Sequence, residues 1–120
     1  MNVVGWFEIY VDDMTRAKAF YQTVLALELT QNEMPEFDMQ MFPSDESYGA
    51  AGALVHSKEV KAGANSTVVY FNCADCAVEE SRVVAAGGSI MQSKFSIGEH
   101  GNISLVHDTE GNLIGLHSMV

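Results

Sequence analysis

Basic residues are scarce in this chain. Six lysines and arginines stand against 16 aspartates and glutamates, which gives a formal net charge of −10 over 120 residues. Because nucleic-acid binding needs clusters of lysine and arginine to neutralise phosphates, this composition argues against a nucleic-acid partner. The negative charge would favour a cationic ligand, although an acidic surface more often serves solubility.

The sequence also lacks the marks of secretion and of membrane insertion. No basic segment precedes a long hydrophobic run, and Glu8 and Asp12 interrupt the apolar N-terminal stretch. We therefore expect neither a signal peptide nor a membrane span. Two cysteines are too few for a disulfide framework, so we expect a cytoplasmic protein.

Familiar cofactor motifs are missing as well. Gly87-Gly88 is typical of a helix end, and no glycine-rich phosphate loop is present. Cys73-Ala-Asp-Cys76 has the spacing of a redox motif, but a zinc site would need a second cysteine pair. Because the surrounding pattern does not fit a redox fold, two ordinary thiols are the simpler interpretation.

What the sequence does contain is one pattern that occurs twice. The segment Ala53–Ser57 matches Ile114–Ser118 at a shift of 61 residues, and both segments end in His-Ser. The same shift places the strand-like run 7–11 over the run 68–72. Such self-similarity indicates repeated modules. We predict a single α+β domain of two βαβββ modules, about 1–60 and about 61–120, related by a pseudo-twofold axis.

Each module is predicted to begin with a strand and a helix capped by an aspartate, Asp13 or Asp75. Apolar stripes should lay the helices on the sheets; they comprise Ala17, Phe20, Tyr21, Val24 and Leu25 in the first helix and Ala77, Val78, Ser81, Val84 and Ala85 in the second. The expected strands are 3–11, 27–31, 36–42, 49–56, 66–72, 89–92, 102–106 and 113–119, with a turn at Met34-Pro35 and a linker at 56–66. The segment 93–101, with Gly98 and Gly101 as hinges, is predicted to be a mobile lid.

Alternation along the strands predicts a cup on the sheet faces away from the helices. Successive side chains of a strand point to opposite faces, so Trp6, Glu8 and Tyr10 share one face, opposite Phe7 and Ile9. The 61-residue shift assigns further residues to this cup, namely Leu54, His56, Phe71, Gly115 and His117. A largely apolar concavity with a few polar groups is the usual form of a small-molecule site.

Two residues of this cup are candidates for chemistry. Glu8, placed between aromatic side chains, could act as a general base or anchor a cationic ligand. His117 could take or give a proton near pH 7. Purely structural roles for both stay open at this point. The candidate ligand-binding residues are Trp6, Tyr10, Leu54, His56, Phe71 and Gly115.

Three segments resemble the vicinal oxygen chelate superfamily, which contains glyoxalase I, bleomycin-resistance proteins and extradiol dioxygenases. They are the runs Trp6–Tyr21, Val69–Asn72 and Asp108–Ser118, and the resemblance covers essentially the whole chain. It implies curved mixed sheets that form ligand-binding cups, usually in a homodimer. It also implies metal ligands on the first and last strands of each module, at positions that fall at Trp6, about Leu54, about Thr67 and Gly115. These side chains are poor ligands for a divalent metal.

The sequence therefore predicts a glyoxalase-like protein that binds a small organic molecule without a metal, with Glu8 and His117 in the acid–base work of a lyase or isomerase. The alternative is a bleomycin-resistance-like protein that sequesters a cationic or aromatic compound. A third hypothesis is a metal-dependent lyase or dioxygenase, in which Glu8, His56 and His117 form a two-histidine, one-carboxylate iron site.

Overall fold

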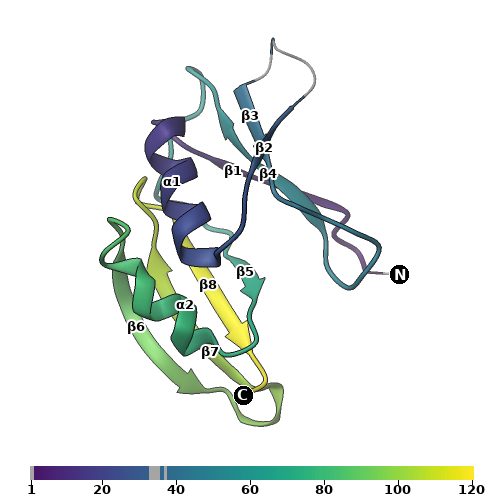
Figure 1. Cartoon of the computed structure of the whole chain (residues 1–120), viewed down its shortest axis with the longest axis vertical. Coiled ribbons are helices and arrows are strands. Elements are labelled where there is room, and N and C mark those ends of the chain that lie inside the picture. The colour runs from purple at the N-terminus through teal and green to yellow at the C-terminus, as the bar shows by residue number, and fades with distance from the viewer. Residues whose placement is uncertain (1, 33–35, 37) are drawn as a thin grey trace.

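The computed structural model describes residues 2–32, 36 and 38–120, and it contains two βαβββ modules (Figure 1). Module one consists of β1 (Trp6–Tyr10), α1 (Met14–Leu25), β2 (Thr30–Gln31), β3 (Asp38–Met41) and β4 (Ala51–His56). Module two consists of β5 (Val69–Asn72), α2 (Cys76–Val83), β6 (Ser89–Ser96), the short 3-10 helix η1 (Gly98–His100), β7 (Asn102–His107) and β8 (Leu113–Ser118). The predicted α+β architecture is confirmed. The predicted turn at Met34-Pro35 lies outside the described residues.

The two four-stranded sheets have the same topology. Their strand orders are β1-β4-β3-β2 and β5-β8-β7-β6. The first strand of each module pairs in parallel with the last, and the remaining neighbours are antiparallel. Strands β1 and β5 therefore both lie at sheet edges, so their outer backbone edges belong to neither ladder.

Aspartate caps begin both helices, as the sequence predicts. The Asp13 carboxylate accepts from the backbone N–H of Arg16 at 3.1 Å, and that of Asp75 accepts from Ala77 at 3.0 Å. Such a bond satisfies one of the N–H groups that a helix leaves free in its first turn. Within the described part of the chain, neither helix is long and apolar enough to cross a membrane.

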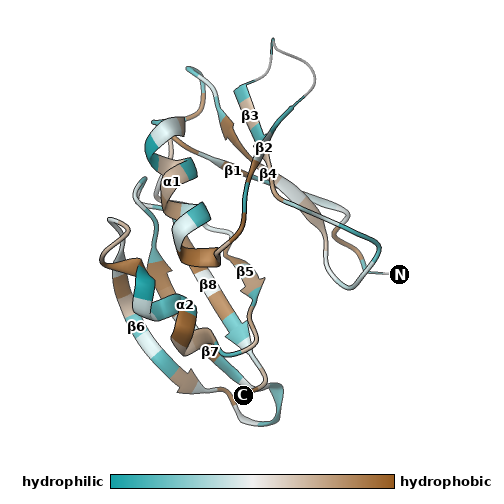
Figure 2. Ribbon diagram, viewed as in Figure 1, coloured by the Kyte–Doolittle hydropathy of each residue, from teal (hydrophilic) through white to brown (hydrophobic). Residues whose placement is uncertain are grey.

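The helices bury their apolar stripes to different extents. Helix α1 buries Ala17, Phe20, Tyr21 and Val24, and its C-terminal turn is strongly hydrophobic in Figure 2. Helix α2 instead buries Cys76 and Val83, which lie two turns apart on one face. The predicted stripe of α2 is therefore wrong, because Val78 and Val84 are 49% and 65% exposed.

One hydrophobic core joins the two modules. It includes Ile9 and Leu54 from the first sheet, and Ile114 and Leu116 from the second. The ring of Tyr21 on α1 bridges them; its centroid lies 5.7 Å from that of Phe42 and 5.9 Å from that of Phe71. Because both sheets pack on the same side chains, the core holds the β1 and β5 edges in a defined relation.

Equivalent residues of the two modules are 62 positions apart, one more than the sequence match indicates. The helix caps Asp13 and Asp75 have this spacing. So do two matching backbone hydrogen bonds, from Val11 N–H to Val55 O at 2.9 Å and from Cys73 N–H to His117 O at 2.8 Å. A shift of one residue reverses the face on which every side chain of a strand lies. The predicted faces of β4 and β5 must therefore be corrected.

The predicted lid is wrong over its first four residues, 93–96, which belong to a strand. Strand β6 continues past Gln92 to Ser96 and pairs with β7, with Phe95 opposite Ile103 and Ser96 opposite Asn102. Its polar residues suggest a loop by composition, but pairing with a neighbouring strand overrides this local preference.

Candidate functional site

On the outer face of the first sheet, the Glu8 carboxylate lies between two aromatic side chains. Trp6 Nε1 and Tyr10 Oη each donate a hydrogen bond to it at 3.2 Å. The three residues share one face, in agreement with the predicted alternation, and Trp6 remains 42% exposed. Burial, and then the hydrogen bond to Glu8 and its charge, raise the pKa of the Tyr10 phenol above its usual value. The result is a fixed, exposed carboxylate with an aromatic group on each side.

The outer face of the second sheet carries His117 together with Tyr70 and Asn72. In the β5–β8 ladder Asn72 is the register partner of His117, and Tyr70 that of Gly115. His117 Nε2 lies 2.7 Å from the backbone oxygen of His100. Since a carbonyl only accepts, Nε2 carries the proton, which leaves Nδ1 of the neutral ring as an acceptor.

Gly115 lies on this outer face beneath an aromatic ring. A Cβ at this position would lie only 2.2 Å from Cδ1 of Tyr70, so a larger residue would push the ring off the sheet. The candidate ligand-binding role of Gly115 stays a prediction, and the structure shows a packing role. Its missing side chain allows Tyr70, 47% exposed, to cover the sheet surface.

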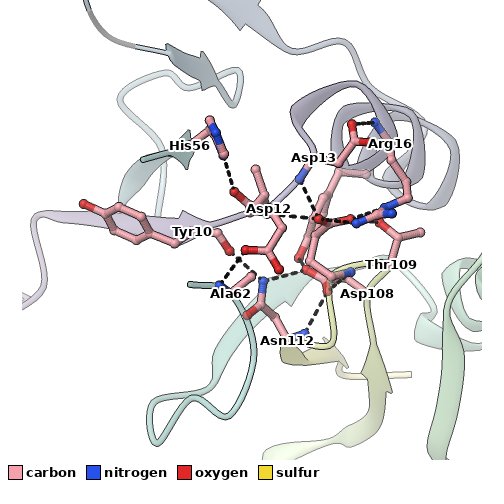
Figure 3. Close-up of polar contacts among 12 residues, drawn as sticks. Tyr10, Asp12, Asp13, Arg16, His56, Ala62, Asp108, Thr109 and Asn112 are labelled. Atoms are coloured by element: carbon pink, nitrogen blue, oxygen red, sulfur yellow. Dashed lines mark hydrogen bonds and ion pairs between the residues drawn. The ribbon is translucent and has the colours of Figure 1, made fainter. Parts of the chain in front are cut away.

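Leu54, Phe71 and His56 do not face the cup, and their predicted placement is wrong. Leu54 is fully buried in the core, and the ring centroid of Phe71 lies 5.5 Å from that of Phe42. His56 lies on the helix side and donates from Nδ1 to the backbone oxygen of Val11 at 2.9 Å (Figure 3). The cause is the one-residue difference between the true spacing and the spacing of the His-Ser match.

The three residues of the hypothetical iron site are therefore not brought together. Glu8 lies on the outer face of the first sheet, His56 on its helix side and His117 on the second sheet. Among the described residues, no three His, Cys, Asp or Glu side chains are placed to hold one metal ion.

A cleft of about 690 Å³ runs between the β1 and β5 edges. Trp6, Phe7 and Glu8 line it from β1, residues 67–72 from β5 and the two residues before it, and Tyr48 from the loop before β4. Of the described residues that line this cleft, Glu8 alone carries a full charge at neutral pH. The cleft therefore combines aromatic walls with one negative charge.

A second cavity of about 490 Å³ adjoins the cleft on the outer face of the second sheet. It contains His117 and shares Tyr48, Tyr70 and Asn72 with the cleft. Glu8 lines the cleft but not this cavity, so the two predicted catalytic residues belong to neighbouring spaces. Their catalytic roles stay a prediction.

Sequence reasoning missed three residues that link these two spaces. Alternation at the 61-residue shift places Tyr70 on the helix side and assigns no role to Asn72, whereas Tyr48 lies in the polar segment between the predicted strands 36–42 and 49–56. Tyr48 is 82% exposed. An aromatic side chain in an otherwise polar loop is the signal that could have identified it.

A buried acid at the β7–β8 turn connects the modules behind the cleft. Glu110 Oε1 accepts from the backbone N–H groups of Asp12 and Asp13 at 3.0 and 2.8 Å, and Oε2 accepts from Arg16 Nε at 2.7 Å (Figure 3 labels these partners). Its side chain is fully buried, while that of Arg16 is about half exposed. Burial alone would raise the pKa of Glu110, but the hydrogen bonds from Arg16, Asp13 and Thr109 outweigh it and hold this pKa at about 2.

Asp108 and Asn112 extend this connection between the modules. We call the four residues Arg16, Asp108, Glu110 and Asn112 the clasp. Tyr21 donates to Asp108 at 2.6 Å, and Asn112 Nδ2 donates to the backbone oxygen of Tyr10 at 2.9 Å. Burial, and then the charge of Asp108, raise the pKa of Tyr21 well above its usual value. The clasp ties the β7–β8 turn to the end of β1 and to α1.

The cysteine pair has no features of a redox site. Cys76 is fully buried, and burial, then the neighbouring Glu79, raise the pKa of Cys73 to about 12. Because the thiolate is the reactive form, Cys73 is a poor nucleophile near neutral pH. This agrees with the interpretation of two ordinary thiols.

Comparison with known proteins identifies the sequence signature and the fold. A family model described as Glyoxalase/Bleomycin resistance protein/Dioxygenase superfamily matches residues 3–116. No match was found among curated proteins.

Several solved structures share the fold at low sequence identity. A glyoxalase-related enzyme from Fulvimarina pelagi superposes with a TM-score of 0.76 at 16% identity, over 98% of this chain and 88% of that one. Glyoxalase I from Zea mays gives 0.75 at 20% identity, over 95% of this chain and 45% of that one. TnmS3, an antibiotic binding protein from Streptomyces sp. CB03234, gives a TM-score of 0.68 at 20% identity, over 98% of this chain and 96% of that one. At these identities the likeness establishes the fold alone.

Proposed function

We propose that this chain, which belongs to the Glyoxalase/Bleomycin resistance protein/Dioxygenase superfamily, binds a small aromatic cation in the cleft between β1 and β5. The observation that carries the proposal is the position of Glu8. Its carboxylate is the single full charge among the described lining residues, and Trp6 and Tyr10 hold it in place from both sides. An aromatic cation would stack on the exposed rings and pair with the carboxylate.

The proposed binding needs no metal ion. His117 lies on the outer face of β8, but among the described residues it belongs to no group of three His, Cys, Asp or Glu side chains that could hold a metal. The other outer-face positions of β4 and β8 are occupied by Ala51, Ala53, Val55, Leu113 and Gly115, and Trp6 lies at the position on β1 that the resemblance implies. None of these side chains coordinates a divalent cation. The residues present therefore do not fit the metal that the superfamily's enzymes imply, and no step of the proposed function passes through one.

Sequestration is favoured over acid–base turnover by the state of Glu8. Both of its oxygens already accept hydrogen bonds, and the side chain is exposed. Each oxygen retains a lone pair that can contact a cation, but an exposed carboxylate lacks the water-excluded surroundings in which a general base acts on a substrate proton. His117 lies in the adjoining cavity, where its Nδ1 would contact the far end of a long ligand.

A homodimer is part of the same proposal. Apolar side chains around the cleft are exposed in the single chain, Val4 by 58% and Tyr48 by 82%. A second copy would cover them and deepen the cleft. Light scattering should then give twice the 13.1 kDa mass of one chain, and a stable monomer at micromolar concentration would rule the dimer out.

The role of Glu8 can be tested with a matched pair of probes, N-methylquinolinium and neutral quinoline. Trp6 is the only tryptophan in the chain, so its fluorescence reports on the cleft directly. We expect Glu8→Gln to weaken N-methylquinolinium binding about fivefold and to remove its salt dependence, because an exposed ion pair contributes at most about 1 kcal/mol. Quinoline binding should stay unchanged.

The control is Glu99→Gln, since Glu99 is an acid whose side chain is 89% exposed and lies outside the cleft. Equal affinities of the native protein and the Glu8→Gln variant for the cation would show that Glu8 does not bind it.

A further inference from the structure

A polar groove of about 470 Å³ lies between α1 and β3, on the helix side of the first sheet. It shares no lining residue with the cleft or with the second cavity. Its described lining residues are Met14, Thr15, Lys18, Ala19, Gln22, Asp38 and Gln40.

The base of this groove contains a buried amide with an unmatched acceptor. Gln40 is only 7% exposed, and its Nε2 donates to Gln31 Oε1 at 2.6 Å. Gln40 Oε1 is buried and has no hydrogen-bond partner among the described residues. A buried acceptor without a donor costs about 1–3 kcal/mol, so such a group calls for a donor from outside the chain.

Two opposite charges flank the amide from different elements. Lys18 projects from α1 and Asp38 belongs to β3, and within the described residues neither forms an ion pair. Gln22 Oε1 already accepts from the backbone N–H of Leu29 at 2.9 Å, so its amide nitrogen is the group left to donate.

We propose that this groove binds a free α-amino acid with an apolar side chain. The ammonium group donates to Gln40 Oε1 and pairs with Asp38, and the carboxylate pairs with Lys18 and accepts from the Gln22 amide. Met14 and Ala19 supply apolar surface for the side chain. Because Gln40 Oε1 is shielded from solvent, the ligand must displace a flexible rim side chain, Lys18 or Met14, to reach it.

Calorimetric titration with L-leucine tests this site. Two analogues separate the charged groups: isocaproate lacks the ammonium and isoamylamine lacks the carboxylate. We expect saturable binding of L-leucine, and binding of each analogue that is weaker by about tenfold or more. No heat with L-leucine, or equal binding of isocaproate, would overturn the proposal.

Two variants assign the binding to the groove. Gln40→Leu keeps the volume and removes the acceptor, and Lys18→Met keeps the stem and removes the charge; each should weaken L-leucine binding about tenfold or more. Lys58→Met, in the exposed loop after β4, should leave it unchanged. A folded Gln40→Leu protein with native L-leucine affinity would contradict the site. An unchanged or lower melting temperature of that variant, combined with no L-leucine binding by the native chain, would mean that a water molecule serves Gln40 and would overturn the proposal.

Discussion

Replacing Glu110 by alanine is expected to lower the free energy of unfolding by about 3 kcal/mol, because it removes the shared partner of several donors. The backbone N–H groups of Asp12 and Asp13 and the guanidinium of Arg16 all donate to this one carboxylate. For a domain of this size the melting temperature should fall by roughly 10 °C. Differential scanning calorimetry measures both quantities.

The matched control is Glu99→Ala, which removes an acid that is 89% exposed and should change the melting temperature little. The clasp also positions the end of β1, so Glu110→Ala should weaken ligand binding in the cleft even where the protein stays folded. If Glu110→Ala melted at the native temperature, the clasp would not hold the modules together.

Acid should destabilise the native protein through the same residue. The pKa of Glu110 is held at about 2, below its ordinary value of 4.5, so the folded state favours the ionised form. Ionised Glu110 therefore makes its full contribution to the free energy of unfolding above about pH 5, and this contribution is lost as the pH falls towards 2. The shift corresponds to about 3 kcal/mol, which screening at half-exposed Arg16 reduces to about 2 kcal/mol.

Urea unfolding at pH 7, 5, 4 and 3 measures this loss. The variant Glu110→Gln keeps the shape of the side chain but not its charge, so its stability should depend less on pH over this range. The difference in free energy of unfolding between the native protein and this variant should therefore shrink as the pH falls. Parallel curves for the two proteins would exclude Glu110 as the source of acid sensitivity.

The architecture was predictable because local signals repeat. Asp13 and Asp75 each precede a helix, and strand-like runs surround both, so the order of elements in the two modules could be read from the chain. The faces of β4 and β5 were not predictable from the same match. The two His-Ser pairs lie 61 residues apart, whereas the folded modules align at 62, and alternation turns that single residue into the opposite face.

The candidate site was predictable in β1 and in β8, where Gly115 and His117 lie on the predicted face, but not in β4 and β5. Trp6, Glu8 and Tyr10 alternate within one continuous run, so no long-range alignment was needed to group them. The clasp could not be found in this way, because Glu110 and its partner Arg16 lie 94 residues apart and glutamate is rarely buried without a partner. Two of the groups that donate to Glu110 are backbone N–H groups at the start of α1, and a pattern of side chains cannot predict bonds to the backbone.

The most direct test is a tryptophan-fluorescence titration of chelator-treated native protein with N-methylquinolinium, repeated after addition of Ni, Zn, Mn or Co. Metal-free binding in the cleft predicts saturable quenching of Trp6 that none of these ions changes. Quenching that occurs only after a metal is added would contradict the account, because it would show that ligand binding in the cleft requires a metal ion. No saturable quenching under any condition would contradict binding of an aromatic cation beside Trp6 and Glu8.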